Sequence, residues 1–253
     1  MKRILILAAA CLAAFGCNIN ISFPLNVVVG NGIETVKSYD LSGFDAISAA
    51  GSMDVVYSQC QDSSSVVLTA DENLIDIFEV RVEEGTLKFS TKKGTSVRSK
   101  VHPVLRVCSP AVNAINLSGS GDCEIRDELL APGAFSFRAS GSGDLNACKI
   151  CCTDFSAKIS GSGSIAVSDL TVNSASAAIS GSGDIAFGAV TAESISIGIS
   201  GSGDAVVGCR NAGDIDIRIS GSGDIRLTGT ARSLKKRISG SGSIHASSLT
   251  LSE

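Results

Sequence analysis

A row of aspartates is the first feature of this sequence whose spacing suggests chemistry. A Ser-Gly-Ser-Gly tract recurs through the second half of the chain, and an aspartate directly follows five copies, at Asp122, Asp144, Asp184, Asp204 and Asp224. If the copies stack in register, about 5 Å apart, neighbouring carboxylates repel each other. A bound cation such as Ca²⁺ would relieve that repulsion, because carboxylate oxygens are its usual ligands. A calcium-dependent binding module is therefore one hypothesis for this chain.

The other hypothesis is that each aspartate accepts hydrogen bonds from backbone N–H groups of its own bend and stays in contact with water. Two features favour it. Ser replaces Asp in two copies, at Ser164 and Ser243, so the position tolerates a neutral residue. Calcium solenoids with Gly-rich repeats also have a shorter period and bends on both sides of each coil, whereas only one bend carries Asp here. We therefore predict no metal site.

Histidine-dependent catalysis has little support in this sequence. Only His102 and His245 are present, and neither neighbours a distinctive Ser or Asp along the chain. No two carboxylates stand out from the aspartate row as the acid pair of a glycosidase. We predict no catalytic residues and no cofactor. A carbohydrate-active solenoid enzyme, lyase-like or hydrolase-like, is the alternative function. A charged groove crossing several coils would favour that enzyme, and a groove-free surface would favour binding.

Nine cysteines are present, and only one group of them has a spacing like that of a metal site. Cys148, Cys151 and Cys152 form a C-x-x-C-C cluster. No second C-x-x-C pair and no nearby histidine completes a zinc site there. We expect buried free thiols or one local disulfide in this cluster.

The elements that position these residues repeat with a period of about 20. The Ser-Gly-Ser-Gly tracts begin at Ser118, Ser140, Ser160, Ser180, Ser200, Ser220 and Ser239. A near-constant period over seven copies is typical of a solenoid. Polar and apolar residues alternate before the tract, as in residues 214–219, and after it, as in residues 224–227, which predicts a half-buried strand on each side. The predicted fold class is all-β, a parallel β-helix or solenoid with two main sheets joined at Gly-Ser-Gly bends.

The two glycines of each tract have a structural role in this fold. They share the inward parity of the apolar residues on either side, and a sharp bend between two sheets leaves no room there for a side chain. A positive φ is a second reason for glycine at such a bend. The bend glycines are Gly119, Gly121, Gly141, Gly143, Gly161, Gly163, Gly181, Gly183, Gly201, Gly203, Gly221, Gly223, Gly240 and Gly242.

The N-terminus indicates export. A basic Lys2-Arg3 start and an apolar stretch over residues 4–15 make residues 1–16 a predicted signal peptide. The residues leading to Cys17 resemble a bacterial lipobox, in which the cysteine becomes the lipidated first residue; cleavage by the ordinary signal peptidase is the alternative. We predict an outer-membrane lipoprotein, periplasmic or surface-facing, that contacts the membrane through a lipid on Cys17.

Behind the signal we expect two regions. Residues 17–37 form a lipid-anchor tether and entry segment, and residues 38–253 form a single β-solenoid domain. Within it, residues 38–116 lack the tract apart from a degenerate copy at residues 51–54, and we predict irregular coils there that cover one end of the stack. Residues 117–253 carry the regular repeats.

Composition narrows the choice of partner. Aromatic residues make up only 4% of the chain and the formal net charge is −4, so we predict no nucleic-acid partner. Outward positions on adjacent coils carry Ala166, Ala186 and Val206 on one sheet, and Ala178 and Gly198 on the other. Small apolar residues on a flat face suit a protein ligand or self-association into a homo-oligomer.

The recurring Ile-Ser-Gly-Ser-Gly-Asp-Ile motif, with Gly-Phe-Asp-Ala-Ile at residues 43–47 and Gly-Ser-Met-Asp-Val at residues 51–55, resembles a bacterial family. It is the putative auto-transporter adhesin, head GIN domain family, frequent in Bacteroidetes. The resemblance covers roughly residues 38–248. It implies a right-handed β-helix-like stack, no conserved enzymatic site and a role in adhesion. We therefore predict a non-catalytic, adhesin-like binding or scaffold protein of the cell envelope, with an unidentified protein or glycan ligand.

Overall fold

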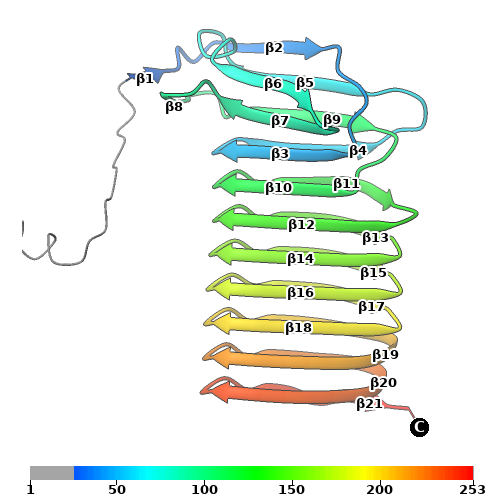
Figure 1. Ribbon diagram of the computed structural model, residues 1–253. Helices are drawn as coiled ribbons and strands as arrows, with labels where there is room; N and C mark the ends of the chain where they lie inside the picture. Colours follow the sequence, from blue (N-terminus) through cyan, green and yellow to red (C-terminus); the bar gives the residue numbers. More distant parts are fainter. Residues whose placement is uncertain (1–25, 253) are drawn as a thin grey trace, which may run out of the picture.

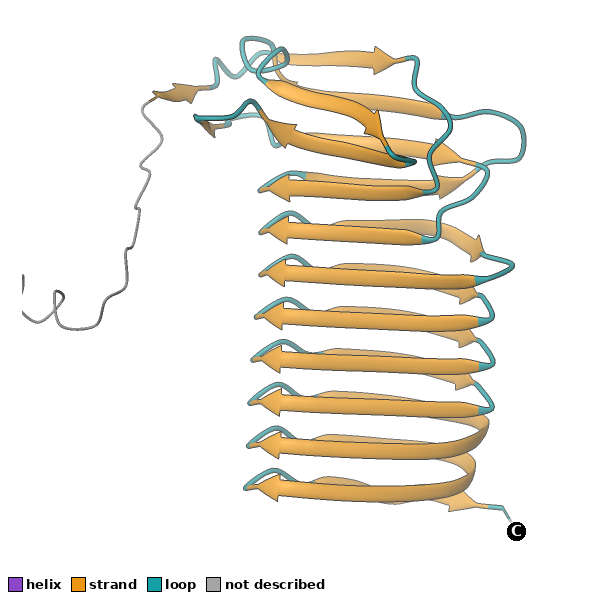
Figure 2. Cartoon of the chain, in the orientation of Figure 1, coloured by secondary structure: helices purple, strands orange, loops and turns teal. Residues whose placement is uncertain are grey.

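Alternation of inward apolar residues with outward polar or small residues builds the regular coils of this protein. The computed structural model describes residues 26–252, and the regular structure of this part is entirely β-strand (Figure 2). The strands stack into a parallel β-solenoid, which confirms the predicted fold class (Figure 1). The predicted signal peptide at residues 1–16 and Cys17 lie outside the described residues. Within residues 26–252, no helix has the length and apolar character that a membrane span requires.

The strands follow one another in a regular order. They are β1 (Asn26–Val29), β2 (Glu34–Tyr39), β3 (Ala46–Gly51), β4 (Asp54–Gln59), β5 (Ser65–Asp71), β6 (Phe78–Glu83), β7 (Thr86–Thr91), β8 (Thr95–Arg98), β9 (Val104–Ser109), β10 (Ala114–Gly119), β11 (Cys123–Leu130), β12 (Ala134–Gly141), β13 (Leu145–Cys151), β14 (Asp154–Gly161), β15 (Ile165–Thr171), β16 (Ser174–Gly181), β17 (Ile185–Thr191), β18 (Ser194–Gly201), β19 (Ala205–Gly221), β20 (Ile225–Gly240) and β21 (Ile244–Leu251).

Each coil contributes one strand to each of two sheets. The pre-bend sheet contains β3, β10, β12, β14, β16, β18 and the C-terminal parts of β19 and β20. The post-bend sheet contains β4, β11, β13, β15, β17, the N-terminal parts of β19 and β20, and β21. Equivalent residues of successive repeats pair in parallel, as Lys158 does with Ala178. Gly51 likewise pairs with Gly119, so residues 51–54 form the first bend, as predicted.

The bend glycines are required because the coils stack backbone upon backbone at this corner. Gly161 has a φ of +138°, in the region that favours glycine. Gly163 needs no positive φ, but a Cβ on it would lie closer than 3.0 Å to the carbonyl oxygen of Gly143 in the preceding coil. The predicted lack of room is therefore confirmed. The obstacle at both glycines is the backbone of the neighbouring coil.

Inward side chains of the two sheets form one continuous core. Phe135 and Phe155 of the pre-bend sheet stack with ring centroids 6.2 Å apart, and Phe187 of the post-bend sheet meets Phe155 edge-on at 5.8 Å. All three are at most 2% exposed. Complete burial of a side chain of this size contributes about 1.5–3 kcal/mol, so the core supplies the stability that the small, Gly-rich bends do not.

The N-terminal cap, residues 26–113, differs from the predicted irregular coils. Its β7 and β9 extend the two sheets in parallel with β3 and β4. Its other main pairings are antiparallel: β2 with β5, β5 with β9, and β6 with β7. These chain reversals lay extra strands over the end of the stack (Figure 1). This end of the stack therefore combines the parallel strands β7 and β9 with antiparallel strands, where irregular coils were predicted.

At the opposite end, the last coil is open to solvent. Lys236 occupies the position that pairs with the buried Ile217 of the preceding coil, and it is exposed. Ile238, next in the same inward set, is 47% exposed. The charged side chain is tolerated at this inward position because no further coil of the described residues covers it.

Candidate binding surface

The predicted surface on the post-bend sheet forms a straight line across three coils. Ala166 pairs with Ala186, and Ala186 pairs with Val206. Ala186 is exposed, Val206 is 48% exposed and Ala166 is half-buried. The structure thus brings all three together on one outer face, as the spacing predicted.

The more pronounced feature lies on the other sheet. A groove of about 890 Å³ runs across the outer face of the pre-bend sheet, from Asn116 to Arg237. Two rows of outward side chains line it. The central row consists of Arg138, Lys158, Ala178, Gly198, Arg218 and Arg237. The serine row consists of Ser140, Ser160, Ser180, Ser200, Ser220 and Ser239, two positions further along each strand.

Strand pairing places the members of each row side by side. Lys158 pairs with Ala178, Ala178 with Gly198, and Gly198 with Arg218. The outward side chains of the central row are shortest at Ala178 and Gly198, so a ligand can come closest to the sheet at these two positions. A Cβ on Gly198 would meet no atom within 4 Å, so the space above it is open. The sequence analysis identified these two small residues, but not the cations that flank them.

The cations of the central row are mostly unpaired. Arg218 donates a hydrogen bond to Oδ2 of Asp216 at 2.9 Å, which holds the pKa of that carboxyl below its ordinary value. Among the residues that the structure describes, no carboxylate forms an ion pair with Arg138, Lys158 or Arg237. Three positive charges of the groove are therefore available to an anionic ligand.

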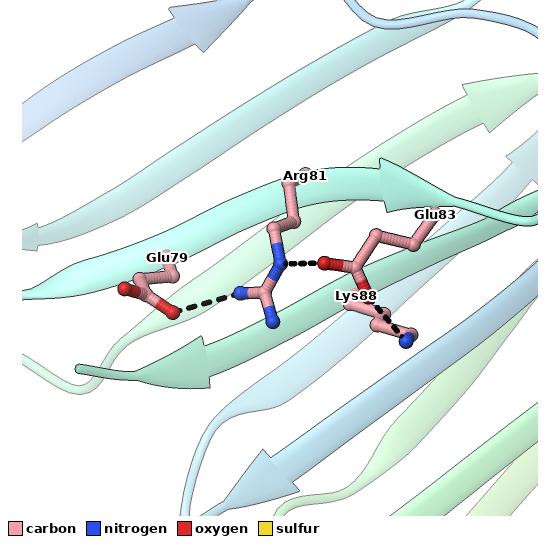
Figure 3. A network of polar contacts seen from close by, with 4 residues as sticks. All are labelled: Glu79, Arg81, Glu83 and Lys88. Carbon is pink, nitrogen blue, oxygen red and sulfur yellow. Dashed lines mark hydrogen bonds and ion pairs between the residues drawn. The ribbon is translucent and has the colours of Figure 1, made fainter. Parts of the chain in front are cut away.

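Charge in the N-terminal cap is arranged differently (Figure 3). On β6, Arg81 donates to Glu79 at 2.7 Å and to Glu83 at 2.6 Å, and Lys88 of β7 donates to the other oxygen of Glu83. These hydrogen bonds, from Lys88 first and then Arg81, lower the pKa of Glu83 to about 2. Two acids and two bases neutralise each other here, so the network offers a ligand no net charge.

The aspartate row forms a ladder between coils. Each carboxylate accepts a hydrogen bond from the backbone N–H of the equivalent residue in a later coil, at 2.7–2.9 Å. The donor–acceptor pairs are Asp122–Asp54, Asp144–Asp122, Ser164–Asp144, Asp204–Asp184, Asp224–Asp204 and Ser243–Asp224. The expectation that each Asp binds its own bend is therefore wrong, because the stacked coil presents its N–H directly to the carboxylate.

The calcium hypothesis finds no donor set in this ladder. Within residues 26–252, no group of three or more His, Cys, Asp or Glu side chains is arranged to hold a metal ion. The row supplies one carboxylate per coil, whereas Ca²⁺ takes six to eight oxygen ligands.

One pairing was missed by the sequence analysis. His102 Nε2 lies 2.8 Å from Oδ2 of Asp54, although the two residues are far apart in the sequence. Both side chains are partly exposed, and the other oxygen of Asp54 accepts the N–H of Asp122. The pair lies at the first bend and is not part of the groove lining.

The cysteines also depart from expectation. Cys60 and Cys108 form a disulfide between the ends of β4 and β9, which no spacing indicated. In the C-x-x-C-C cluster, Cys148 is exposed and Cys151 and Cys152 are half-buried, so the predicted burial is wrong. Each of the three is a free thiol. Cys148 and Cys151 belong to β13, and Cys152, directly after that strand, packs against the edge of the core.

The same architecture occurs in solved structures. A putative adhesin from Bacteroides fragilis has 21% sequence identity and a TM-score of 0.77, over 86% of this chain and 99% of that one. A putative adhesin from Parabacteroides distasonis has 22% identity and a TM-score of 0.74, over 87% and 99%. A putative lipid binding protein from Parabacteroides distasonis has 30% identity and a TM-score of 0.67, over 87% and 99%.

Two further comparisons concern sequence. The model of the family described as "Putative auto-transporter adhesin, head GIN domain" matches residues 43–212 and 188–253. Among curated proteins none matches this chain.

Proposed function

Since this chain belongs to the putative auto-transporter adhesin, head GIN domain family, we propose that it is a non-catalytic, adhesin-like binding protein of the bacterial cell envelope. The groove on the pre-bend sheet is the observation that carries the proposal. It crosses successive coils and presents cations and hydroxyl groups, which can hold an extended ligand by charge-assisted and neutral hydrogen bonds.

The lining of the groove supports binding more than catalysis. It contains no carboxylate and no histidine. Neither the acid pair of a glycosidase nor a Ser-His-Asp set can form from these residues, so a lyase with a lysine base is the catalytic alternative that the lining leaves. A charged groove across several coils was expected to favour the enzyme, and the pre-bend sheet carries such a groove. A charged groove serves a binding protein equally well. The residue types in the lining therefore distinguish a binding protein from an enzyme better than the presence of the groove does.

A carbohydrate-active enzyme is the second candidate, and the groove across several coils is the observation that favours it. A binding protein leaves its ligand intact, whereas a carbohydrate-active enzyme shortens it. Prolonged incubation of the full chain with oligogalacturonate, followed by chromatography, is expected to return intact oligomers. Shortened oligomers that disappear with the Lys158→Ala variant would replace the proposal with the enzyme.

The Cys60–Cys108 disulfide supports a location in the envelope, because disulfides persist in oxidising compartments outside the cytoplasm. We propose attachment to the outer membrane through a lipid on Cys17. Growth with a labelled fatty acid tests this: the label is expected in the chain and absent from a Cys17→Ala variant. Equal labelling of both would overturn the anchor.

Orientation is tested through Cys148, the exposed thiol of the described residues. A membrane-impermeant maleimide added to intact cells is expected to modify Cys148, with Cys148→Ser as the control. Modification only after cell lysis would show a periplasmic protein, and an adhesin role would then fail. Cells that lack the chain are also expected to adhere less to their natural substratum.

Self-association through Ala166, Ala186 and Val206 is a separate proposal for the post-bend sheet. A charge at its centre, in Ala186→Glu, would leave the fold intact because the side chain points outward. Sedimentation of wild type and variant is expected to show an oligomer only for the wild type. If the variant and the wild type sediment alike, this surface is not an interface between copies.

A further inference from the structure

We propose that the groove binds a linear acidic polysaccharide that lies along the solenoid axis, with its anionic groups over the cations at the two ends of the central row. This inference rests on the proposed binding function and gives its ligand a chemical class. Four observations carry it: the straightness of the row, its unpaired charges, its uncharged centre and the pairing of the sheet beneath it.

The row requires an extended ligand. Its six members occupy equivalent positions in consecutive strands, each paired with the next. At about 4.8 Å between neighbouring strands, the row from Arg138 to Arg237 is about 24 Å long. The serine row runs beside it over the same length. A compact ligand would contact two or three coils, whereas a straight polymer contacts all of them.

The charges require anionic groups on that polymer. Arg138 and Lys158 lie at one end of the row and Arg218 and Arg237 at the other. Of these four, Arg218 alone has a carboxylate partner among the described residues. The paired network of Glu79, Arg81, Glu83 and Lys88 shows how this chain neutralises cations elsewhere (Figure 3). Among the described residues, no carboxylate forms such a pair with Arg138, Lys158 or Arg237.

The centre of the row suits an uncharged stretch of sugar. Lys158 and Arg218 are three strands apart, or about 14 Å, with Ala178 and Gly198 between them. The open space above Gly198 lets a sugar ring approach the sheet closely. Ser180 and Ser200 beside it can both donate to and accept from sugar hydroxyls.

The sheet beneath the groove argues against a peptide that binds as an added strand. A peptide that binds a sheet adds to an open edge, where unpaired backbone groups are available. The groove instead lies on a sheet face, where strands on both sides already pair with their neighbours, as β16 does with β14 and β18. A glycan needs no backbone partner, because it is recognised by side-chain donors and acceptors. No aromatic side chain lines the groove, so uncharged sugars gain no aromatic stacking there, and the cations distinguish an acidic polymer from a neutral one.

The test compares two forms of one polymer. Immobilised full chain is titrated with oligogalacturonate and with the same oligomer after methyl esterification, which keeps the sugar backbone and removes the charge. We expect binding of the acid form that weakens as salt rises, and binding at least tenfold weaker for the ester. Equal affinity for both forms, or affinity for neither, would overturn the proposal.

Charge-reversal variants locate the site. Lys158→Glu and Arg218→Glu, at the two sides of the uncharged centre, are each expected to weaken binding of oligogalacturonate by about tenfold or more. Arg226→Glu is the matched control: Arg226 is an exposed cation on the post-bend sheet, paired in register with Val206. Equal weakening by Arg226→Glu would reduce the effect to overall charge and reject the groove.

Two further ligands test whether the groove recognises a glycan or any anionic polymer or surface. Polyglutamate carries a similar charge on a peptide backbone, and anionic lipid vesicles carry it on a membrane. If either binds the groove as tightly as oligogalacturonate, the assignment to glycans is wrong. Surface labelling of Cys148 and loss of adhesion in cells lacking the chain, without any binding of oligogalacturonate, would reject the ligand class and retain the proposed function. Cleavage of oligogalacturonate would retain acidic polysaccharides as the ligand class and reject the proposed non-catalytic function.

Discussion

The backbone N–H of Asp224 donates a hydrogen bond to Oδ1 of Asp204, one coil before it, at 2.7 Å. This relationship explains how the protein tolerates like charges stacked coil on coil. Each carboxylate is held against a donor of the neighbouring bend, and hydrogen bonds to a charged acceptor are stronger than neutral ones. The same bond fixes the register of adjacent coils at their sharpest corner.

Removal of one of these hydrogen bonds between coils is expected to lower the stability of the solenoid modestly. Asp204→Ala should lower the free energy of unfolding by about 1 kcal/mol, because one charge-assisted bond is lost while repulsion from two neighbours is relieved. Urea unfolding measures the change. Asp127→Ala is the control, since Asp127 is exposed and accepts no hydrogen bond from the described residues. A loss no larger than that of the control would mean that the ladder contributes nothing to stability.

Calcium is expected to leave the protein unchanged. The carboxylates of the ladder already accept backbone N–H groups, and the described residues offer no cluster of metal-binding side chains. The thermal midpoint should therefore be the same with millimolar CaCl₂ and with chelator. A rise with calcium that chelator reverses, and that Asp204→Ala abolishes, would restore the calcium-dependent module.

Two glycines of different surroundings should respond oppositely to substitution. Gly163→Ala places a Cβ against the backbone of Gly143, so the coils must separate, and we expect a loss of several kcal/mol or failure to fold. Gly198→Ala places a Cβ in open space on a strand and should be neutral or stabilising by up to about 1 kcal/mol. Urea unfolding of both variants provides the comparison, and equal losses would contradict it.

Asp71 should make the cap sensitive to acid. Burial alone would raise the pKa of this carboxyl, but the backbone N–H groups of Gly32, Val101 and Lys100 outweigh burial and hold its pKa below the ordinary value. A lowered pKa in the folded state means that the carboxylate stabilises the fold above the unfolded pKa, near 4. That stabilisation is lost as the pH falls through the lower, folded value.

The variant Asp71→Asn tests this linkage. Its amide group has one acceptor oxygen in place of two, so one N–H of Gly32, Lys100 or Val101 faces another donor. We expect a loss of about 1–3 kcal/mol at neutral pH and a flatter dependence of stability on pH below 5. An unchanged acid profile, measured by unfolding at several pH values, would remove Asp71 from the explanation.

The disulfide is expected to stabilise the cap. Cys60 and Cys108 are separated by 48 residues, and closing a loop of that length restricts the unfolded chain. Cys60→Ser with Cys108→Ser should lower the free energy of unfolding by about 2–5 kcal/mol, and reduction of the wild type should do the same. Cys148→Ser serves as the control, since Cys148 is a free, exposed thiol. If reduction changes neither the midpoint nor protease resistance, the disulfide is not a structural element.

The regular coils could be predicted because each one repeats the same local instructions. Alternating residues set the inward column, and in-register parallel stacking carried Lys158 next to Ala178 without any long-range information. The N-terminal cap could not be predicted in the same way. Residues 26–45 and 55–113 have no period, so the antiparallel pairing of β2 with β5 and the meeting of Cys60 with Cys108 depend on chain reversals that no spacing specifies.

The Ser-Gly-Ser-Gly-Asp repeat by itself determined the solenoid, the bend and the parity of every regular strand, because period and alternation are properties of the chain alone. Only the tertiary structure decided what the repeated residues bind. Asp204 meets a donor of the next coil and not of its own, since stacking brings that N–H closer. The groove also exists only in the stack: its charges come from strands far apart in the sequence, and only the sheet aligns them around Ala178 and Gly198.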